Sequence, residues 1–489
     1  MIPVTLATIA DAVGGRTDRA DGTVLVTGNV EFDSRKVGPG DLFVAVPGER
    51  VDGHDFAERA IAAGAVAVLA ARAVDGPAII VPPLAAGASR ALALAGDRDG
   101  SGAAVLAALG ALARFVVSRL TEHGLTVVGV TGSSGKTSTK DLIAGLLGDL
   151  GPTIAPPGSF NNELGHPWTA LRATEQTRHL VLELSARGPG HIAALCEIAP
   201  PRIGAVLNVG TAHLGEFGSR EQIAIAKGEL VEALPADGVA VLNADDPLVA
   251  AMAERTAARV VLVGEASTAQ VRATDVLLDD SARPGFRLVT PTGEAKVQLG
   301  LYGAHQVGNA LTAAAIALEL GATLDQVVAG LERARPVSGR RMEVTTRTDG
   351  VTVINDAYNA NPESMRAALK AAATMSRNTT DGHQRRSWAV LGPMGELGEE
   401  SIAGHDEIGR LAVRLDISRL VVVGDEARAM FQGAHLEGSW GEESVLVPDV
   451  EAAVALLRAE LSPGDVVLVK ASNAAGLWRV ADALLEGVR

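Results

Sequence analysis

The sequence is nearly free of cysteine: Cys196 is the single thiol among 489 residues. One cysteine cannot form an intramolecular disulfide, and it excludes a zinc site built from several cysteines. A chain without disulfides fits the reducing cytoplasm, where we expect this protein. The N-terminal stretch MIPVTLATIADAVGG lacks the basic segment and apolar core of a secretory signal. No run of about 18 uncharged apolar residues is found, so we expect no membrane insertion.

Basic residues are scarce relative to acidic ones, with 43 Lys and Arg against 58 Asp and Glu and a net charge of −15. Such a chain repels the phosphates of nucleic acids and of anionic lipids, which excludes general binding to either. Apolar residues make up 47% of the sequence, which is enough for several cores and excludes disorder over most of the chain. At roughly 150 residues per domain, the length predicts about three domains.

Short β-branched runs alternate with Ala- and Leu-rich stretches, a pattern typical of βαβ units and parallel sheets. The pattern predicts three α/β blocks in series. The predicted strands are 41–48, 65–71, 78–83, 125–132, 180–184, 203–210, 238–245, 387–392, 420–425 and 465–471, with 343–348 and 351–356 as a pair. The predicted helices include 223–234, 305–320 and 450–461. Residues 85–104 are rich in Ala, Gly, Ser and Asp, which predicts a linker or surface insertion.

The strongest motif is VTGSSGKTSTKD at 130–141, between a predicted strand and a helical run. Glycines allow backbone N–H groups to curl around phosphate oxygens, and Lys136 offers a positive charge to the β- and γ-phosphates. The Thr137 hydroxyl is a ligand type that Mg²⁺ accepts. The strict phosphate-loop pattern begins with a glycine, and Val130 stands there instead.

Each of the remaining motifs, taken alone, is weak evidence for a functional site. Glu183 ends a predicted strand, His213 follows another, and Lys227 lies among small apolar residues of a predicted helix. Each of these has an ordinary structural explanation, as a solvated carboxylate, a structural histidine and a snorkelling lysine. His305 and Asn309 share one face of a helix, where an asparagine near the start is often a cap.

Taken together and in order, these stretches resemble the Mur ligase family, whose phosphate loops are of the TG-[ST]-[SN]-GKT kind. The resemblance covers nearly the whole chain. It rests on DSRKVGPGDLFVAVPGERVDGHDF (33–56), SFNNELGHPWT (159–169), NVGTAHLGEFGS (208–219), LNADDP (242–247), NDAYNANPESM (355–365) and LGPMGELG (391–398). The last two stretches resemble the members that add D-alanyl-D-alanine.

The resemblance implies a three-domain α/β fold. A small N-terminal UDP-binding module would occupy 1–86, a central P-loop ATP-binding domain with a parallel sheet 87–336, and a Rossmann-like C-terminal ligase domain 337–489. It also implies an ATP- and Mg²⁺-dependent ligase that adds D-alanyl-D-alanine to UDP-N-acetylmuramoyl-tripeptide through an acyl phosphate, in the cytoplasmic phase of peptidoglycan synthesis. We expect a monomer that acts on small molecules.

The resemblance also implies a role for each matching residue. The predicted catalytic residues are Lys136, His213 and Lys227, the last carrying a carbamate. The predicted ATP-binding residues are Gly132, Ser133, Ser134, Gly135, Lys136, Thr137, Ser138, Asn309, Arg341 and Asp356, with Arg340 as the alternative to Arg341. The predicted metal ligands are Thr137, Glu183, His213 and Lys227. The predicted substrate-binding residues are Asp33, Ser34, Arg35, Asn161, Asn162, Arg187, Asn359 and Asn361.

Some positions depart from the family pattern. Ala471 and Asn473 stand where LVKGSR-type stretches have Gly and Arg, a difference that bears on dipeptide binding. Two alternative functions stay open on the sequence. One is another amino-acid-adding enzyme of the Mur or folylpolyglutamate type. The other is a P-loop NTPase switch, which would hydrolyse nucleotide without a muramoyl substrate.

Overall fold

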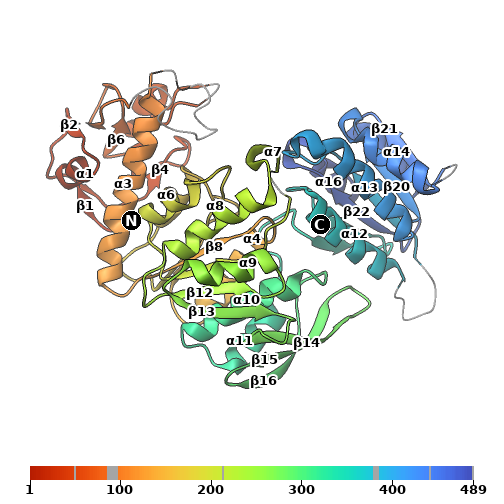
Figure 1. Ribbon diagram of the computed structural model, residues 1–489. Coiled ribbons are helices and arrows are strands. Elements are labelled where there is room, and N and C mark those ends of the chain that lie inside the picture. Colours follow the sequence, from red (N-terminus) through yellow and green to blue (C-terminus); the bar gives the residue numbers. More distant parts are fainter. Residues whose placement is uncertain are drawn as a thin grey trace.

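The structure is a computed structural model that describes residues 1–48, 51–84, 97, 99–211, 214–377, 385–439 and 442–486. Three α/β units follow one another along the chain, and the central unit lies between the other two (Figure 1). Each unit is built on a sheet formed from one continuous stretch of the sequence.

The N-terminal unit is a five-stranded sheet in the order β2-β7-β6-β5-β4, accompanied by a two-stranded ribbon of β1 and β3. Within the five-stranded sheet the pairs are parallel except for β2 with β7, and the β1–β3 ribbon is antiparallel. The elements are β1 (Val4–Thr5), α1 (Leu6–Ala12), β2 (Arg16–Asp18), β3 (Leu25–Val26), β4 (Val30–Glu31), β5 (Leu42–Val44), η1 (Gly53–Phe56), α2 (Ala57–Ala62), β6 (Ala67–Ala70) and β7 (Ala78–Ile80). Helix α3 (Ser101–Glu122) follows and packs against elements of both this unit and the central unit.

The central unit is a nine-stranded sheet in the order β16-β15-β14-β13-β12-β11-β8-β10-β9. Strands β9 to β14 are parallel neighbours, and β14, β15 and β16 add an antiparallel edge that the sequence did not predict. The strands are β8 (Thr126–Thr131), β9 (Thr153–Ile154), β10 (His179–Glu183), β11 (Ile203–Val206), β12 (Val239–Asn243), β13 (Arg259–Gly264), β14 (Val271–Leu278), β15 (Pro284–Thr290) and β16 (Gly293–Gln298).

Helices cover both faces of this sheet. They are α4 (Lys136–Gly148), α5 (Gly165–Ala170), α6 (His191–Ile198), α7 (Leu214–Phe217), α8 (Arg220–Glu232), α9 (Pro247–Ala250), η3 (Ala251–Arg255), α10 (Gln306–Glu319) and α11 (Leu324–Arg333). The β8, β10 and β11 strands are adjacent and parallel, so the segments that follow them meet at one edge. These segments carry the phosphate loop, Glu183 and Asn208.

The C-terminal unit is a six-stranded sheet in the order β17-β18-β22-β19-β20-β21, antiparallel only between β17 and β18. Its elements are β17 (Glu343–Thr346), β18 (Thr352–Asn355), α12 (Pro362–Arg377), β19 (Ser387–Leu391), η4 (Gly398–Glu400), α13 (Ser401–Arg414), β20 (Arg419–Val423), η5 (Asp425–Ala427), α14 (Arg428–Glu437), β21 (Ser444–Val447), α15 (Val450–Glu460), β22 (Val466–Lys470), η6 (Asn473–Ala475) and α16 (Trp478–Leu485). The strands and helices predicted from the sequence are confirmed in type, with ends that differ by a few residues.

The prediction of a linker over 85–104 is wrong for residues 101–104, which form the first turn of α3. Alanine is the strongest helix former, and carboxylates placed before this alanine-rich stretch start the helix. Asp97 accepts hydrogen bonds from the N–H groups of Gly102 and Ala103, at 3.1 and 2.9 Å. Residues 85–96 and 98 lie outside the described residues.

Helix α3 is long and apolar enough to cross a membrane by length and composition alone, with a mean hydropathy of 1.7. It is the one helix in the described ranges that meets this criterion. However, 67% of its most apolar window is buried inside the protein, where α3 packs against α1, α5 and α6. This packing accounts for the apolar side chains as part of the core.

Candidate active site

A cavity of about 430 Å³ opens between the central and C-terminal units, at the edge where β8, β10 and β11 end. Both units supply its polar lining. The lining includes Ser133, Ser134, Gly135, Lys136, Thr137, Ser138, Ser159, Asn161, Glu183, Arg187, Asn208, His305, Asn309, Arg341, Asp356, Tyr358, Asn359, Asn361, Glu363, Glu396 and Lys470. Most of the predicted site residues are therefore brought together in one place.

The phosphate loop joins β8 to α4. Gly135 has φ of +80°, which glycine adopts freely, and helix α4 begins at the next residue. The Lys136 Nζ donates to the Gly132 carbonyl at 2.7 Å, so the loop curls around its own lysine. Asn208, just after β11, accepts a hydrogen bond from the Ser134 N–H at 2.9 Å and holds the loop from the neighbouring strand.

Glu183 lies at the centre of a set of oxygen atoms beside this loop. The Thr137 hydroxyl donates to Glu183 Oε2 at 2.9 Å, and Asn161 Nδ2 donates to Oε1 at 2.8 Å. The Ser159 hydroxyl lies 2.9 Å from the Thr137 hydroxyl. Hydroxyl and carboxylate oxygens next to a phosphate loop are the donors that Mg²⁺ prefers, so this set fits that ion.

Two lysines are buried near this centre. Burial lowers the pKa of Lys136, and the Glu183 carboxylate opposes that shift. Burial also lowers the pKa of Lys227, on α8, well below its usual range, and the positive charge of Lys136 adds to the effect. A lysine with a strongly lowered pKa has a neutral, nucleophilic amine near neutral pH. His213 lies outside the described residues.

The adjacent arginines at the start of the C-terminal unit point in different directions. Arg341 lines the cavity, donates to the Ser159 hydroxyl at 2.6 Å and lies 4.3 Å from the centre of the Tyr358 ring. Arg340 instead lies 3.9 Å from the centre of the Trp478 ring. The geometry favours Arg341 over Arg340 as the nucleotide contact.

Asn309 and Asp356 line the same cavity as this arginine. Asn309 packs so closely on the phosphate loop that a Cβ on Gly135 would lie 2.7 Å from its Oδ1. Asp356 Oδ2 forms an ion pair with Lys470 Nζ at 2.5 Å, and its Oδ1 accepts from the Met342 N–H at 2.9 Å. Lys470 also donates to the Asn359 carbonyl at 2.9 Å, which fixes the turn after β18.

Some predicted substrate residues lie away from this cavity. Asp33, Ser34 and Arg35 follow β4 in the N-terminal unit, where the guanidinium of Arg35 lowers the pKa of Asp33 to about 2. Asn162 does not line the cavity and instead accepts a hydrogen bond from the Gly165 N–H at 2.9 Å, at the start of α5. Arg187 does line it, with its guanidinium 3.7 Å from the Glu396 carboxylate.

The structure also adds residues that sequence reasoning missed. Ser159, Asn208, Glu363 and Lys470 all contribute polar atoms to the cavity. Ser159, Asn208 and Glu363 stand inside stretches quoted for the resemblance, but none of these residue types carries a signal of its own there. Lys470 lies near the end of a predicted strand, next to the unusual Ala471, and is the last residue of β22.

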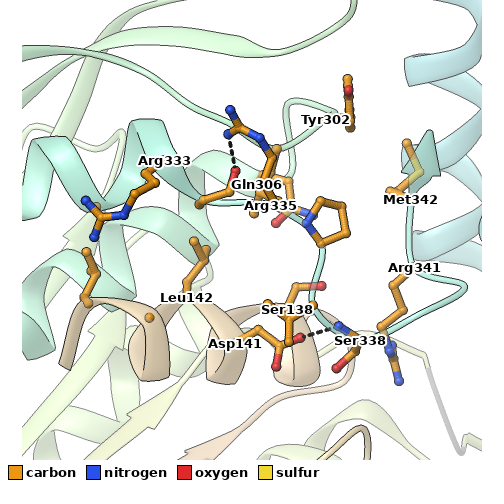
Figure 2. A pocket seen from close by; sticks show the side chains of 17 residues that line it. Ser138, Asp141, Leu142, Tyr302, Gln306, Arg333, Arg335, Ser338, Arg341 and Met342 are labelled. Atoms are coloured by element: carbon orange, nitrogen blue, oxygen red, sulfur yellow. Dashed lines mark hydrogen bonds between the residues drawn. The ribbon is translucent and has the colours of Figure 1, made fainter. Parts of the chain in front are cut away.

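A second cavity of about 290 Å³ adjoins the first, beneath the segment that links the central and C-terminal units. Figure 2 shows it with Ser138, Asp141 and Leu142 of α4 on one side and Tyr302 and Met342 on the other. The Ser338 N–H donates to Asp141 at 3.2 Å and ties the linking segment to α4. The two cavities share Ser138, Gln306, Arg341 and Met342.

Comparisons with known proteins agree with this arrangement. The Mur ligase family catalytic domain matches residues 27–93, the Mur ligase middle domain 130–317, and the Mur ligase glutamate ligase domain 340–473. The chain is 61% identical over 504 residues to UDP-N-acetylmuramoyl-tripeptide–D-alanyl-D-alanine ligase of Mycobacterium tuberculosis, covering 99% of this chain and 98% of that protein. The chain belongs to the Mur ligase family.

Solved structures of Mur ligases share the fold over the whole length. A crystal structure of MurF from Acinetobacter baumannii matches with a TM-score of 0.84 and 30% identity, covering 99% of both chains. MurF from Thermotoga maritima, solved in complex with ADP, matches with a TM-score of 0.76 and 30% identity over 95% of this chain and 98% of that one. The predicted family and the predicted α/β fold are confirmed.

Proposed function

We propose that this Mur ligase joins D-alanyl-D-alanine to the terminal carboxylate of UDP-N-acetylmuramoyl-tripeptide, using ATP, in the cytoplasmic phase of peptidoglycan synthesis. The observation that carries the proposal is the 61% identity, over 99% of the chain, to a relative named for this activity. The cavity supports it, because a phosphate loop and polar groups of the C-terminal unit face one another across it. We further propose a monomer with domains at 1–86, 87–336 and 337–489.

Amide formation from a free carboxylate is uphill in water, so a carboxylate oxygen first attacks the γ-phosphorus of ATP, which forms the acyl phosphate and releases ADP. Both partners in that step are anions, and positive groups must offset their repulsion. The N–H groups of the loop at Ser133 to Thr137 and the ammonium of Lys136 serve this purpose. The amine of the dipeptide then attacks the acyl phosphate, and the tetrahedral intermediate releases phosphate to leave the new amide.

Arg341, Asn309 and Asp356 would hold the nucleoside. Arg341 and Asn309 supply hydrogen-bond donors and acceptors suited to a purine, and Asp356 supplies a carboxylate suited to ribose hydroxyls. Asp33, Ser34 and Arg35 would bind the uridine end, Asn161, Asn162 and Arg187 the muramoyl and pyrophosphate region, and Asn359 and Asn361 the incoming dipeptide.

Thr137 and Glu183 would hold Mg²⁺ on the β- and γ-phosphates, where the ion neutralises phosphate charge. His213 and a carbamate on Lys227 would hold a second Mg²⁺. The neutral amine expected of buried Lys227 is the form that reacts with CO₂, and the product is an anionic oxygen ligand. The carbamate accounts for a lysine placed beside the positive charge of Lys136.

The first experiment measures phosphate release from ATP and Mg²⁺ with UDP-N-acetylmuramoyl-tripeptide, with and without D-alanyl-D-alanine, and the product mass. We expect release that needs both substrates and a product heavier by the dipeptide residue mass. Release that responds to single amino acids instead would assign another amino-acid-adding ligase. Turnover indifferent to both substrates would assign a nucleotide switch.

A second experiment tests the carbamate. We expect Lys227→Ala to lose nearly all ligase activity, and wild-type activity to fall in CO₂-depleted buffer and return with bicarbonate. Lys370→Ala, at an exposed position of α12, is the matched control and should keep full activity. Full activity of Lys227→Ala would contradict the assignment.

A further inference from the structure

Glu363 crosses from the C-terminal unit to the loop that supports the phosphate loop. It lies in the first turn of α12, and its Oε1 accepts two hydrogen bonds from Thr211, one from the N–H and one from the hydroxyl, both at 2.9 Å. The approach is close enough that a Cβ on Gly210 would lie 3.0 Å from this oxygen. The Gly210 N–H in turn donates to the Ser133 hydroxyl at 2.9 Å.

The second carboxylate oxygen of Glu363 is in a different position. Oε2 is buried and, within the described part of the chain, accepts no hydrogen bond. Glu363 also lines the active-site cavity, next to Asn359, Asn361 and Ser364. A buried carboxylate oxygen without a donor is costly, so a site that keeps one has a use for it once a ligand is bound.

The ligand that satisfies this oxygen must be a donor, and a cation is favoured over a neutral group. The phosphates of ATP, the pyrophosphate of the UDP-linked substrate and its reacting carboxylate are anions, which a carboxylate repels. The incoming dipeptide carries an ammonium group at the end that reacts. In the proposed function it is bound by Asn359 and Asn361, which line the same cavity as Glu363.

We propose that Glu363 Oε2 binds the ammonium of the incoming D-alanyl-D-alanine, an assignment that rests on the proposed ligase function. The same carboxylate then has two tasks. Its Oε1 holds the C-terminal unit to the Thr211 loop. Its Oε2 binds the ammonium and then accepts one of its protons, so that the free amine has a lone pair with which to attack the acyl phosphate. The residue thereby selects an amine as the nucleophile and positions it only while the two units are docked.

The test uses Glu363→Gln in the full-length enzyme, because glutamine keeps an oxygen for the two Thr211 hydrogen bonds and loses the charge. We measure inhibition by the dipeptide analogue in which a hydroxyl replaces the amino group, and compare it with the KM for D-alanyl-D-alanine. For the wild type, we expect the inhibition constant of the hydroxyl analogue to exceed the KM for D-alanyl-D-alanine by about tenfold or more. In the variant, we expect the two constants to be similar. The KM values for ATP and for the UDP-linked tripeptide should stay within about twofold of wild type.

Glu396→Gln is the matched control, since it removes one carboxylate from the same cavity where Glu396 pairs with Arg187. It should keep the preference for the amine. Two results would overturn the proposal: a preference kept in Glu363→Gln, or one lost equally in both variants. A raised Mg²⁺ requirement with the preference intact would also overturn it, because the carboxylate would then serve a metal ion. If the wild-type enzyme does not join the dipeptide to the UDP-linked tripeptide, that result would refute the proposed function instead.

Discussion

Single residues in the cavity owe their properties to burial rather than to their local sequence. Glu183 is 1% exposed and Lys227 is 2% exposed, and neither has the neighbours along the chain that would mark it as functional. A carboxylate is rarely buried without hydrogen-bond donors, and Glu183 receives them from Thr137 and Asn161, far from it in the sequence. This information comes from the fold, which explains why each motif was weak in the sequence.

Replacing Glu183 with glutamine tests its predicted role at the metal. The amide keeps the hydrogen-bonding shape but removes the charge that attracts a divalent cation. We expect the Mg²⁺ concentration for half-maximal activity to rise by about ten- to a hundredfold. The measurement is the Mg²⁺ dependence of phosphate release. Glu175→Gln, at an exposed position of the same unit, should show the wild-type requirement, and an unchanged requirement in Glu183→Gln would refute the assignment.

Burial of His166 on α5 makes stability depend on pH. Burial lowers its pKa to about 4, against about 6.5 in an unfolded chain. Between these values the unfolded state binds a proton that the folded state does not, so acidification favours unfolding. The cost grows as pH falls below about 6.5 and reaches about 2 kcal/mol at pH 5.

Urea denaturation of wild type and His166→Gln at pH 7, 6 and 5 checks this expectation. Between pH 7 and pH 5, the free energy of unfolding of the variant should fall by about 2 kcal/mol less than that of wild type, whatever its value at pH 7. His123→Gln, at an exposed position after α3, should follow the wild-type pH dependence. If the free energy of unfolding falls equally with pH in wild type and His166→Gln, His166 is not the source of the pH dependence.

At the scale of elements, the β8–loop–α4 segment shows what the sequence could predict. Glycine, lysine and threonine at this spacing after an apolar strand are typical of a phosphate-binding loop. Residues 130–141 therefore predicted both the strand–loop–helix element and its role. Helix α3 was missed because its alanines follow a stretch rich in glycine and aspartate. Strands β14 to β16 were missed because they lie at the sheet edge, where polar residues interrupt any continuous apolar run.

The loop geometry predicts the effect of Gly135→Ala. A Cβ there would meet Asn309, and a positive φ is unfavourable for alanine by roughly 1–2 kcal/mol. We expect the KM for ATP to rise by about tenfold or more because the loop can no longer close on phosphate. Gly148→Ala, at the end of the same helix with no atom within 4 Å of the added Cβ, is the control and should bind ATP normally.

At the scale of the whole molecule, polar contacts around the cavity join the C-terminal unit to the central unit. They join Arg341 to Ser159, Glu363 to Thr211 and Arg187 to Glu396. None of these pairs could be predicted from the sequence, because their members are more than 150 positions apart and only the fold brings them together. Helix α7 also packs against η4 across this junction. Interfaces between domains of one chain commonly permit relative motion, so we expect the units to move when ligands bind.

Small-angle scattering tests this motion. We expect the radius of gyration to change when an ATP analogue and UDP-N-acetylmuramoyl-tripeptide are added together, because the substrates bridge the units. Addition of the ATP analogue alone serves as the control, because it binds without the second substrate that bridges the units. Identical scattering curves with and without both ligands would count against domain closure.

The continuity of each sheet has a consequence for how new specificities arise. The six-stranded sheet draws all its strands from Glu343 to Lys470, and the chain reaches it through one short connection. Such a unit can be exchanged as a block by recombination. A chimaera that keeps Arg341 and the phosphate loop but takes the following unit from a relative should activate the same carboxylate and accept a different amine. Diversification of the nucleophile can thus proceed without rebuilding the machinery that consumes ATP.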